Sequence, residues 1–211
     1  MHCSCALDTP QKGGGSSLND YAAPFHIKEP NVTDKEACLP LPSACLADRE
    51  EENLQVVIIK PNSKDQFVNE HSKKVFLAGT IDFGNSEDWQ AKIEKEIIEH
   101  CHNVTIFNPR INFDNGEKWE NTPESFNKQV NWEQDNLEAS DIIFMFIGGS
   151  SKSPISLLEL GQFISSGKMI VCCEKEFYRY DNVRIMCERN NVTLFNDLDV
   201  AITDLLSKLP K

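Results

Sequence analysis

Glu159 is a carboxylate inside a helix that otherwise reads as apolar. It lies in the sequence "KSPISLLELGQF", where a rotation of 100° per residue places it beside Ile155 in an apolar stripe. Ser153 followed by Pro154 predicts the start of this helix, with the serine hydroxyl as its cap. A buried carboxylate requires partners or a function. The alternative is an ordinary surface glutamate on a partly exposed helix.

Glu133 holds a similar position in a second predicted helix. In the sequence "TPESFNKQVNWEQDNLEAS" it shares an apolar stripe with Phe126, Val130 and Leu137, whereas Asp135 falls on the opposite side. We therefore expect Glu133 on the packed face. The alternative is that Glu133 simply pairs with a lysine or an arginine.

Two such carboxylates suit glycosidic chemistry. One can attack or stabilise the sugar carbon, while the other positions or protonates the leaving group. Both predicted helices flank the apolar run "DIIFMFIG" (141–148), so Glu133 and Glu159 are expected near the same strand. The pair is the strongest catalytic candidate in the sequence.

The elements that must position these residues alternate between strands and helices. Apolar runs predict strands at 54–60, 74–80, 104–109, 141–148, 168–173 and 192–195. Helical patterns lie at 87–100, 122–140, 154–164, 183–189 and 197–209. This alternation predicts an α/β fold with a parallel sheet covered by helices on both faces.

Ligands in such folds bind beyond the carboxyl ends of the strands. The residues expected there form our candidate substrate-binding set: Gly79, Thr80, Asp82, Asn108, Arg110 and Ser153. The helix that follows Ser153 offers its N-terminus to an anion. The segment after Gly79 is neither a G-x-G-x-x-G dinucleotide motif nor a Walker phosphate loop.

The composition of the chain limits which partners the protein is expected to bind and in which compartment it is expected to act. The 211 residues carry a net charge of −12, which argues against polymeric nucleic acid or an anionic membrane as the main partner. No apolar run reaches the roughly 20 residues of a membrane span, and the N-terminus lacks the apolar core of a signal peptide. We expect a cytoplasmic protein whose eight cysteines are free thiols. The Cys3 and Cys5 pair does not complete a common zinc spacing, so no metal site is predicted.

The first 53 residues differ from the remainder. They contain a Gly-Gly-Gly-Ser-Ser run, scattered prolines and the acidic segment "DREEEN". Few of them could contribute to a core. We expect residues 1–53 to be a disordered, acidic, cysteine-containing tail and residues 54–211 to form the folded domain.

The ordered motifs "VFLAGTIDFGNSEDW", "FNPR", "QVNWEQDNLEASDIIFMF" and "SPISLLELG" resemble the nucleoside 2-deoxyribosyltransferase-like family over roughly residues 54 to 208. This resemblance implies a flavodoxin-like three-layer sandwich with a mostly parallel five-stranded sheet. It also implies that Glu159, in the E-L-G motif, is the nucleophile. Glu133, eight residues before Asp141, matches an acidic residue that assists the base, although members of the family have aspartate there.

The implied activity is cleavage of the N-glycosidic bond of a nucleoside or a nucleoside 5′-monophosphate. A covalent glycosyl ester on Glu159 would pass the sugar to another base or to water, without a cofactor. Donors to Glu159 are expected from Tyr178, Tyr180 or backbone N–H groups. The resemblance also implies a homo-oligomer, in which Asn182 is the candidate lent by a neighbouring subunit. The competing hypothesis is a non-catalytic nucleotide-binding or regulatory module on the same fold.

Overall fold

The computed structural model describes residues 55–63, 68–81, 87–111 and 122–211. Its strands are β1 (Val56–Ile59), β2 (Lys73–Gly79), β3 (Val104–Phe107), β4 (Ile142–Ile147), β5 (Met169–Cys173) and β6 (Leu194–Phe195). Its helices are α2 (Trp89–His100), α3 (Pro123–Ala139), α4 (Pro154–Phe163), α5 (Tyr180–Arg189) and α6 (Leu198–Ser207). The predicted tail, residues 1–53, lies outside the described residues.

The strands form one parallel sheet in the order β1-β3-β2-β4-β5-β6. The predicted α/β class is confirmed, but the expected count of five strands is wrong, because the described part of the chain contributes six. The two edges of the sheet are β1, which pairs with β3, and β6, which pairs with β5.

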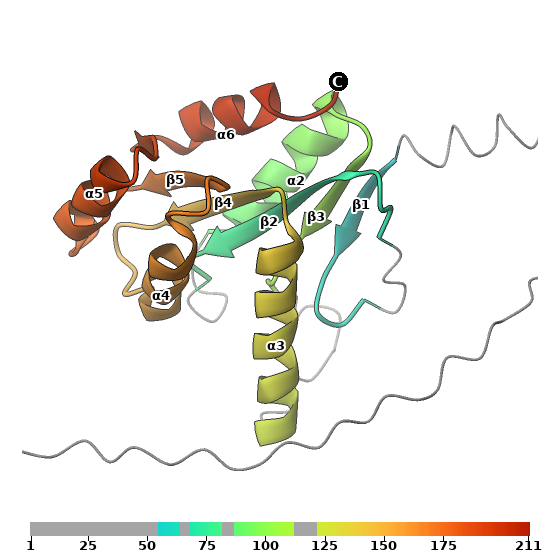
Figure 1. Cartoon of the computed structure of the whole chain (residues 1–211), viewed down its shortest axis with the longest axis horizontal. Coiled ribbons are helices and arrows are strands. Elements are labelled where there is room, and N and C mark those ends of the chain that lie inside the picture. The colour runs from blue at the N-terminus through green and yellow to red at the C-terminus, as the bar shows by residue number, and fades with distance from the viewer. Residues whose placement is uncertain (1–54, 64–67, 82–86, 112–121) are drawn as a thin grey trace, which may run out of the picture. The chain divides into compact units, whose positions relative to one another are not determined.

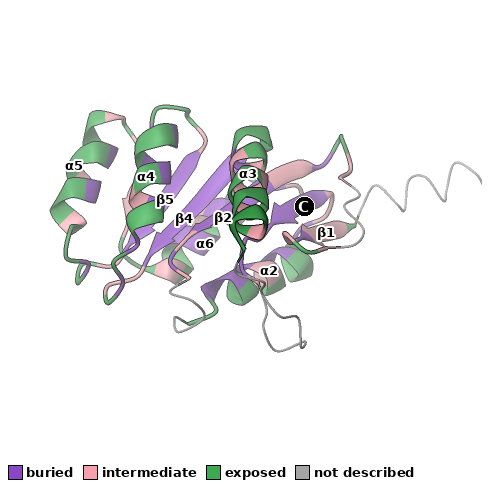
Figure 2. Cartoon of the chain, turned by 90° about the horizontal axis from the view of Figure 1, so that it is seen from below, coloured by how far each residue is buried: buried purple, intermediate pink, exposed green. Residues whose placement is uncertain are grey.

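Helices cover both faces of the sheet and complete three layers (Figures 1 and 2). On one face, α3, α4 and α5 enclose a core that includes Phe76, Leu137, Leu160 and Val183. The opposite face is covered by α2 and α6. The central strands are buried on both sides, which explains why their sequences are apolar without alternation.

Local sequence signals define most helix starts. The Asp88 carboxylate caps α2 by accepting a hydrogen bond from the N–H of Ala91. Thr122 and Ser125 form a reciprocal capping box at the start of α3, with Pro123 in the first turn. The α4 helix begins differently, because Ser153 makes no side-chain cap bond and adopts φ 39° and ψ 49°. The expectation that the Ser153 hydroxyl caps α4 is therefore wrong.

The sheet reverses its direction of growth at β2 and β4. From β2 the chain crosses to β3 on one side, and then returns over β2 through α3 to reach β4 on the other side. In parallel sheets, the carboxyl ends of strands at such a reversal border the ligand crevice. The segments that follow β2 and β4 therefore border the expected ligand crevice.

No helix within the described ranges is both long and apolar enough to cross a membrane.

Candidate active site

Glu159 is buried on α4, with 7% of its surface exposed. Within the described residues, its carboxyl group accepts no hydrogen bond and forms no ion pair. Burial is the main cause that raises its pKa from 4.5 to about 8, and the charge of Glu133 raises it further. At neutral pH the free protein therefore holds Glu159 mainly as the neutral acid.

Neither of the two tyrosines expected as donors to Glu159 hydrogen-bonds to it in the free protein. The hydroxyl group of Tyr180 pairs with the side chain of Asn196. Tyr178 is 59% exposed and packs its ring against Phe177. The prediction that a tyrosine supports the charged form of Glu159 is wrong in the free protein.

Glu133 is half-buried on α3 and is close enough to Glu159 for the two carboxyl groups to interact electrostatically. Burial raises the pKa of Glu133, while a hydrogen bond from Gln129 opposes that rise. In this bond the Nε2 of Gln129 donates to Oε1 of Glu133 over 2.8 Å. Asp135 is exposed on another side of the helix. The structure thus brings Glu133, and not Asp135, to Glu159.

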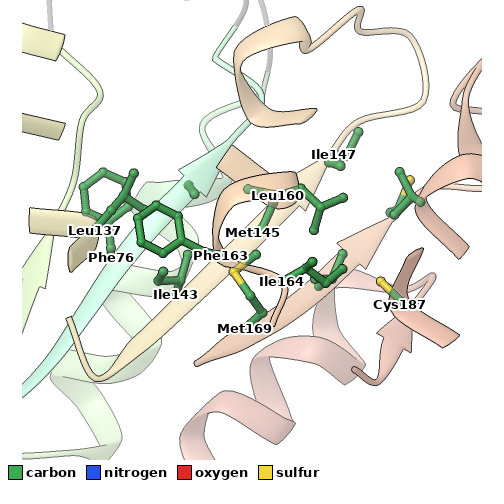
Figure 3. Close-up of a cluster of buried hydrophobic side chains, with 14 of the residues drawn as sticks. Phe76, Leu137, Ile143, Met145, Ile147, Leu160, Phe163, Ile164, Met169 and Cys187 are labelled. Atoms are coloured by element: carbon green, nitrogen blue, oxygen red, sulfur yellow. The ribbon is translucent and has the colours of Figure 1, made fainter. Parts of the chain in front are cut away.

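An apolar contact between the two helices and the sheet sets the position of the carboxyl pair. Phe76 of β2, Leu137 of α3 and Phe163 of α4 belong to one buried cluster (Figure 3). Trp132, next to Glu133, packs its ring against Phe76 with the ring centroids 6.2 Å apart. This apolar contact therefore holds α3 and α4 against the sheet close to Glu133 and Glu159.

The apolar stripe of α3 that contains Glu133 is not buried along its whole length. Phe126 is 57% exposed and Val130 is 37% exposed, whereas Leu137 is fully buried. The expectation of one packed stripe is thus correct only for the C-terminal part of the helix. The N-terminal part of α3 extends past the sheet (Figure 1).

Three hydroxyl groups form a buried chain where β2 and β4 end. The Oγ1 of Thr80 lies 2.6 Å from Oγ of Ser153, which lies 2.7 Å from Oγ of Ser151. The backbone N–H groups of Gly148 and Ser153 donate into this chain, to Thr80 and Ser151 respectively. The hydroxyl of Ser153 is therefore used to join the two strand ends, which explains why it does not cap α4.

Gly79 is required by close contact with the neighbouring strand. It adopts φ +135°, and a Cβ atom there would lie 2.0 Å from the carbonyl oxygen of Phe146. The next N–H group, of Thr80, donates to that same oxygen over 2.9 Å. Gly79 thus brings the polar residues after β2 against the end of β4.

The side chains of Asn108 and Arg110 are turned into the protein. Asn108 donates to Glu94 and accepts from the N–H of Arg110, so it holds the turn after β3. Arg110 is 8% exposed, and its Nε lies 3.5 Å from a carboxylate oxygen of Asp88. These contacts attach the end of β3 to α2, at its N-cap Asp88 and at Glu94 within the helix. Asp82, the remaining candidate after β2, lies outside the described residues.

Asn182 lies away from the two carboxyl groups of its own chain. It is exposed on α5, in a groove of about 370 Å³ between α4 and α5 whose wall includes Leu157 and Gly161. At 100° per residue, this wall is on the side of α4 opposite Glu159. The fold does not bring Asn182 to Glu159 within one chain.

Two features of this region have no counterpart in the sequence predictions. The first is the bond from Gln129 to Glu133; a spacing of four residues in a helix is the signal that could have indicated it. The second is Glu174 after β5, whose carboxylate accepts the N–H of Gly149 over 2.6 Å. No cluster of metal-ligating side chains occurs among the described residues.

The chain is similar to one protein family and to several solved structures. The family model described as nucleoside 2-deoxyribosyltransferase like matches residues 72–177. One similar solved structure is a 2-deoxyribosyltransferase from the psychrotolerant bacterium Bacillus psychrosaccharolyticus, with 20% identity and a TM-score of 0.47, covering 65% of this chain and 96% of that one. Another is a CMP N-glycosidase from Clostridium botulinum, with 19% identity and a TM-score of 0.39, covering 63% and 98%. A search of curated proteins finds no match.

Proposed function

Since the chain belongs to the nucleoside 2-deoxyribosyltransferase-like family, we propose that it cleaves the N-glycosidic bond of a nucleoside or a nucleoside 5′-monophosphate. Glu159 attacks C1′ and forms a covalent glycosyl ester, which then passes the sugar to another base or to water. The observation that carries this proposal is the buried, unpaired carboxyl group of Glu159 beside Glu133. A structural carboxyl group would be expected to have hydrogen-bond or ionic partners.

The raised pKa of Glu159 supports a cycle in which the two carboxyl groups share one proton. In this cycle, Glu159 carries the proton before reaction and Glu133 is the ionised partner whose charge contributes to that rise. When substrate is bound, the proton passes to Glu133 and leaves Glu159 as the carboxylate. The bond from C1′ to the base nitrogen breaks as the ester bond to Glu159 forms, and Glu133 gives the proton to the departing base.

The second half of the cycle restores this proton. The acceptor, water or a second base, attacks C1′ and gives up a proton to ionised Glu133. The ester bond breaks and Glu159 is released as a carboxylate, so the pair again holds one proton. These steps use only the two carboxyl groups and therefore call for no metal ion or organic cofactor.

The hydroxyl chain is the proposed site for the sugar and its 5′ substituent. Thr80, Ser151 and Ser153 lie together directly before α4, the helix that carries Glu159. Helix N-termini favour anions, so a 5′-phosphate would be accommodated there. Gly79 and Asp82 are proposed to border this site, whereas Asn108 and Arg110 support it indirectly through α2.

We also propose that the active form is a homodimer or a larger assembly. Four apolar side chains are exposed on the helices that carry the acids: Phe126, Val130, Ile155 and Leu158. A second subunit could cover them and bring its Asn182 to the site. Light scattering should detect an oligomer, and a fully active monomer would contradict this part of the proposal.

The direct test is incubation with a panel of nucleosides and nucleoside 5′-monophosphates, followed by chromatography for free base. Glu159→Gln should abolish base release, because an amide cannot form the ester. With a 2-fluoro-substituted nucleoside, the wild-type protein should gain the mass of one glycosyl group on the peptide that contains Glu159. Unchanged turnover by a folded Glu159→Gln variant would instead favour the non-catalytic binding module.

Glu133→Gln tests the second carboxyl group, with Asp135→Asn as the matched control on the same helix. Loss of proton transfer should reduce turnover by about 10²-fold or more. Substrates with better leaving groups should be less affected, and Asp135→Asn should change little. An equal loss in both folded variants would contradict the assignment of Glu133.

A further inference from the structure

Gln129 lies one helical turn before Glu133 and touches the carboxyl group that the proposed cycle protonates and deprotonates. Its side chain is half-buried, and its Nε2 donates to Oε1 of Glu133 over 2.8 Å. Within the described residues this is the only hydrogen bond made by the Glu133 carboxyl group. Gln129 therefore determines how that group is held on α3.

No cation competes with this contact in the part of the chain that the structure describes. Glu159, from α4, is the titratable group of a neighbouring element that interacts with Glu133. From β2, the neighbouring contact is the apolar ring of Phe76 against Trp132. On α3 itself, Lys128 and Asp135 are exposed and point to other sides. The polar support of Glu133 thus comes from a neutral amide.

We propose that Gln129 is a positioning residue that holds the Glu133 carboxyl group in one orientation in both of its protonation states. An amide contains both a donor and an acceptor. Its N–H donates to the carboxylate, and after a half-turn of the amide its carbonyl oxygen accepts the O–H of the acid. A lysine could support only the ionised form, and a methionine could support neither.

This inference rests on the proposed function, in which Glu133 alternates between acid and carboxylate, but its first test is independent of activity. In protein labelled with ¹³C at the glutamate carboxyl groups, Glu133→Gln and Glu159→Gln assign the two signals for NMR titration. Gln129→Met should raise the pKa of Glu133 by about one unit, because the hydrogen bond lost to the charged carboxylate is stronger than the one lost to the neutral acid. Gln129→Lys should lower it. Asn131→Met, an exposed change on the same helix, should leave it unaltered.

The second test compares base release across pH and leaving groups. Gln129→Lys should keep Glu133 ionised and reduce turnover by about 10²-fold for a poor leaving group, with a smaller loss for a good one. Gln129→Met should shift the acidic limb of the pH profile upward, as in the titration.

The outcomes separate the two proposals. If no nucleoside is cleaved, the proposed function fails, and the NMR titration still decides whether Gln129 holds Glu133. If base is released but both Gln129 variants, folded by circular dichroism, leave the Glu133 titration unchanged, the role of Gln129 is refuted. Should Gln129→Met unfold, Gln129→Leu provides the same loss of both donor and acceptor.

Discussion

Replacing Glu159 by glutamine should stabilise the free protein above neutral pH, although it removes the proposed nucleophile. The carboxyl group has an ordinary pKa of 4.5 and a pKa of about 8 in the folded protein. Between these values the folded chain holds a proton that the unfolded chain has lost, so stability falls as pH rises. This loss is complete above about pH 8. Glutamine is neutral throughout and avoids it.

The expected size follows from the same two values. One pKa unit corresponds to about 1.4 kcal/mol, so the rise from 4.5 to about 8 amounts to about 5 kcal/mol when complete. Between pH 5 and pH 9, the advantage of Glu159→Gln over the wild type should grow by about 4 kcal/mol. Such a change is a large fraction of the stability of a typical domain.

Urea unfolding at a series of pH values, followed by the fluorescence of buried Trp89, measures this difference. Glu138→Gln, an exposed change on α3, is the control and should alter stability by no more than about 0.5 kcal/mol at any pH. A difference between wild type and Glu159→Gln that does not change from pH 5 to pH 9 would refute the reasoning that Glu159 is buried as a neutral acid.

Further outcomes are expected for the tail, the strand contact and the buried thiols. Removal of residues 1–53 should leave both the fold and base release intact, and unfolding of the truncated protein in a thermal scan would contradict this domain boundary. Gly79→Ala should destabilise the folded protein by about 3 kcal/mol or more, because the added Cβ has no room. Gly161→Ala lies in a helix with open space around it, so it should stabilise the folded protein by about 0.5–1 kcal/mol in chemical unfolding. Burial raises the pKa of Cys173 to about 12 and that of Cys187 to about 11. Both thiols should therefore resist iodoacetamide until urea unfolds the chain. Rapid alkylation of either thiol in the folded protein, detected by mass spectrometry, would overturn this expectation.

Local patterns in the sequence were sufficient to predict the elements and their faces. Apolar runs without alternation predicted buried central strands, and β4 and β5 are buried at every position. Helical periodicity placed Glu133, and not Asp135, towards the interior. These predictions succeeded because side-chain direction in a regular element depends only on its repeat.

The predictions that failed concerned contacts between residues of different helices, strands and loops. Ser153 was expected to cap α4, but its hydroxyl group joins Thr80 across the gap between two strand ends. Two tyrosines were expected to donate to Glu159, but the hydroxyl group of Tyr180 pairs with Asn196 and Tyr178 is exposed. A hydrogen-bonding side chain selects among all groups that the fold brings near it, and a pattern within one segment contains no information about that choice.

The sequence by itself therefore predicted the type of chemistry, through two carboxyl groups in the apolar stripes of neighbouring helices. Only the tertiary structure decided the protonation state of these groups. The pKa of Glu159 depends on how much water the packed helices exclude and on the nearby charge of Glu133. Solvent exclusion and the electrostatic interaction between segments both arise when the layers assemble, because they depend on distances that no local sequence pattern specifies.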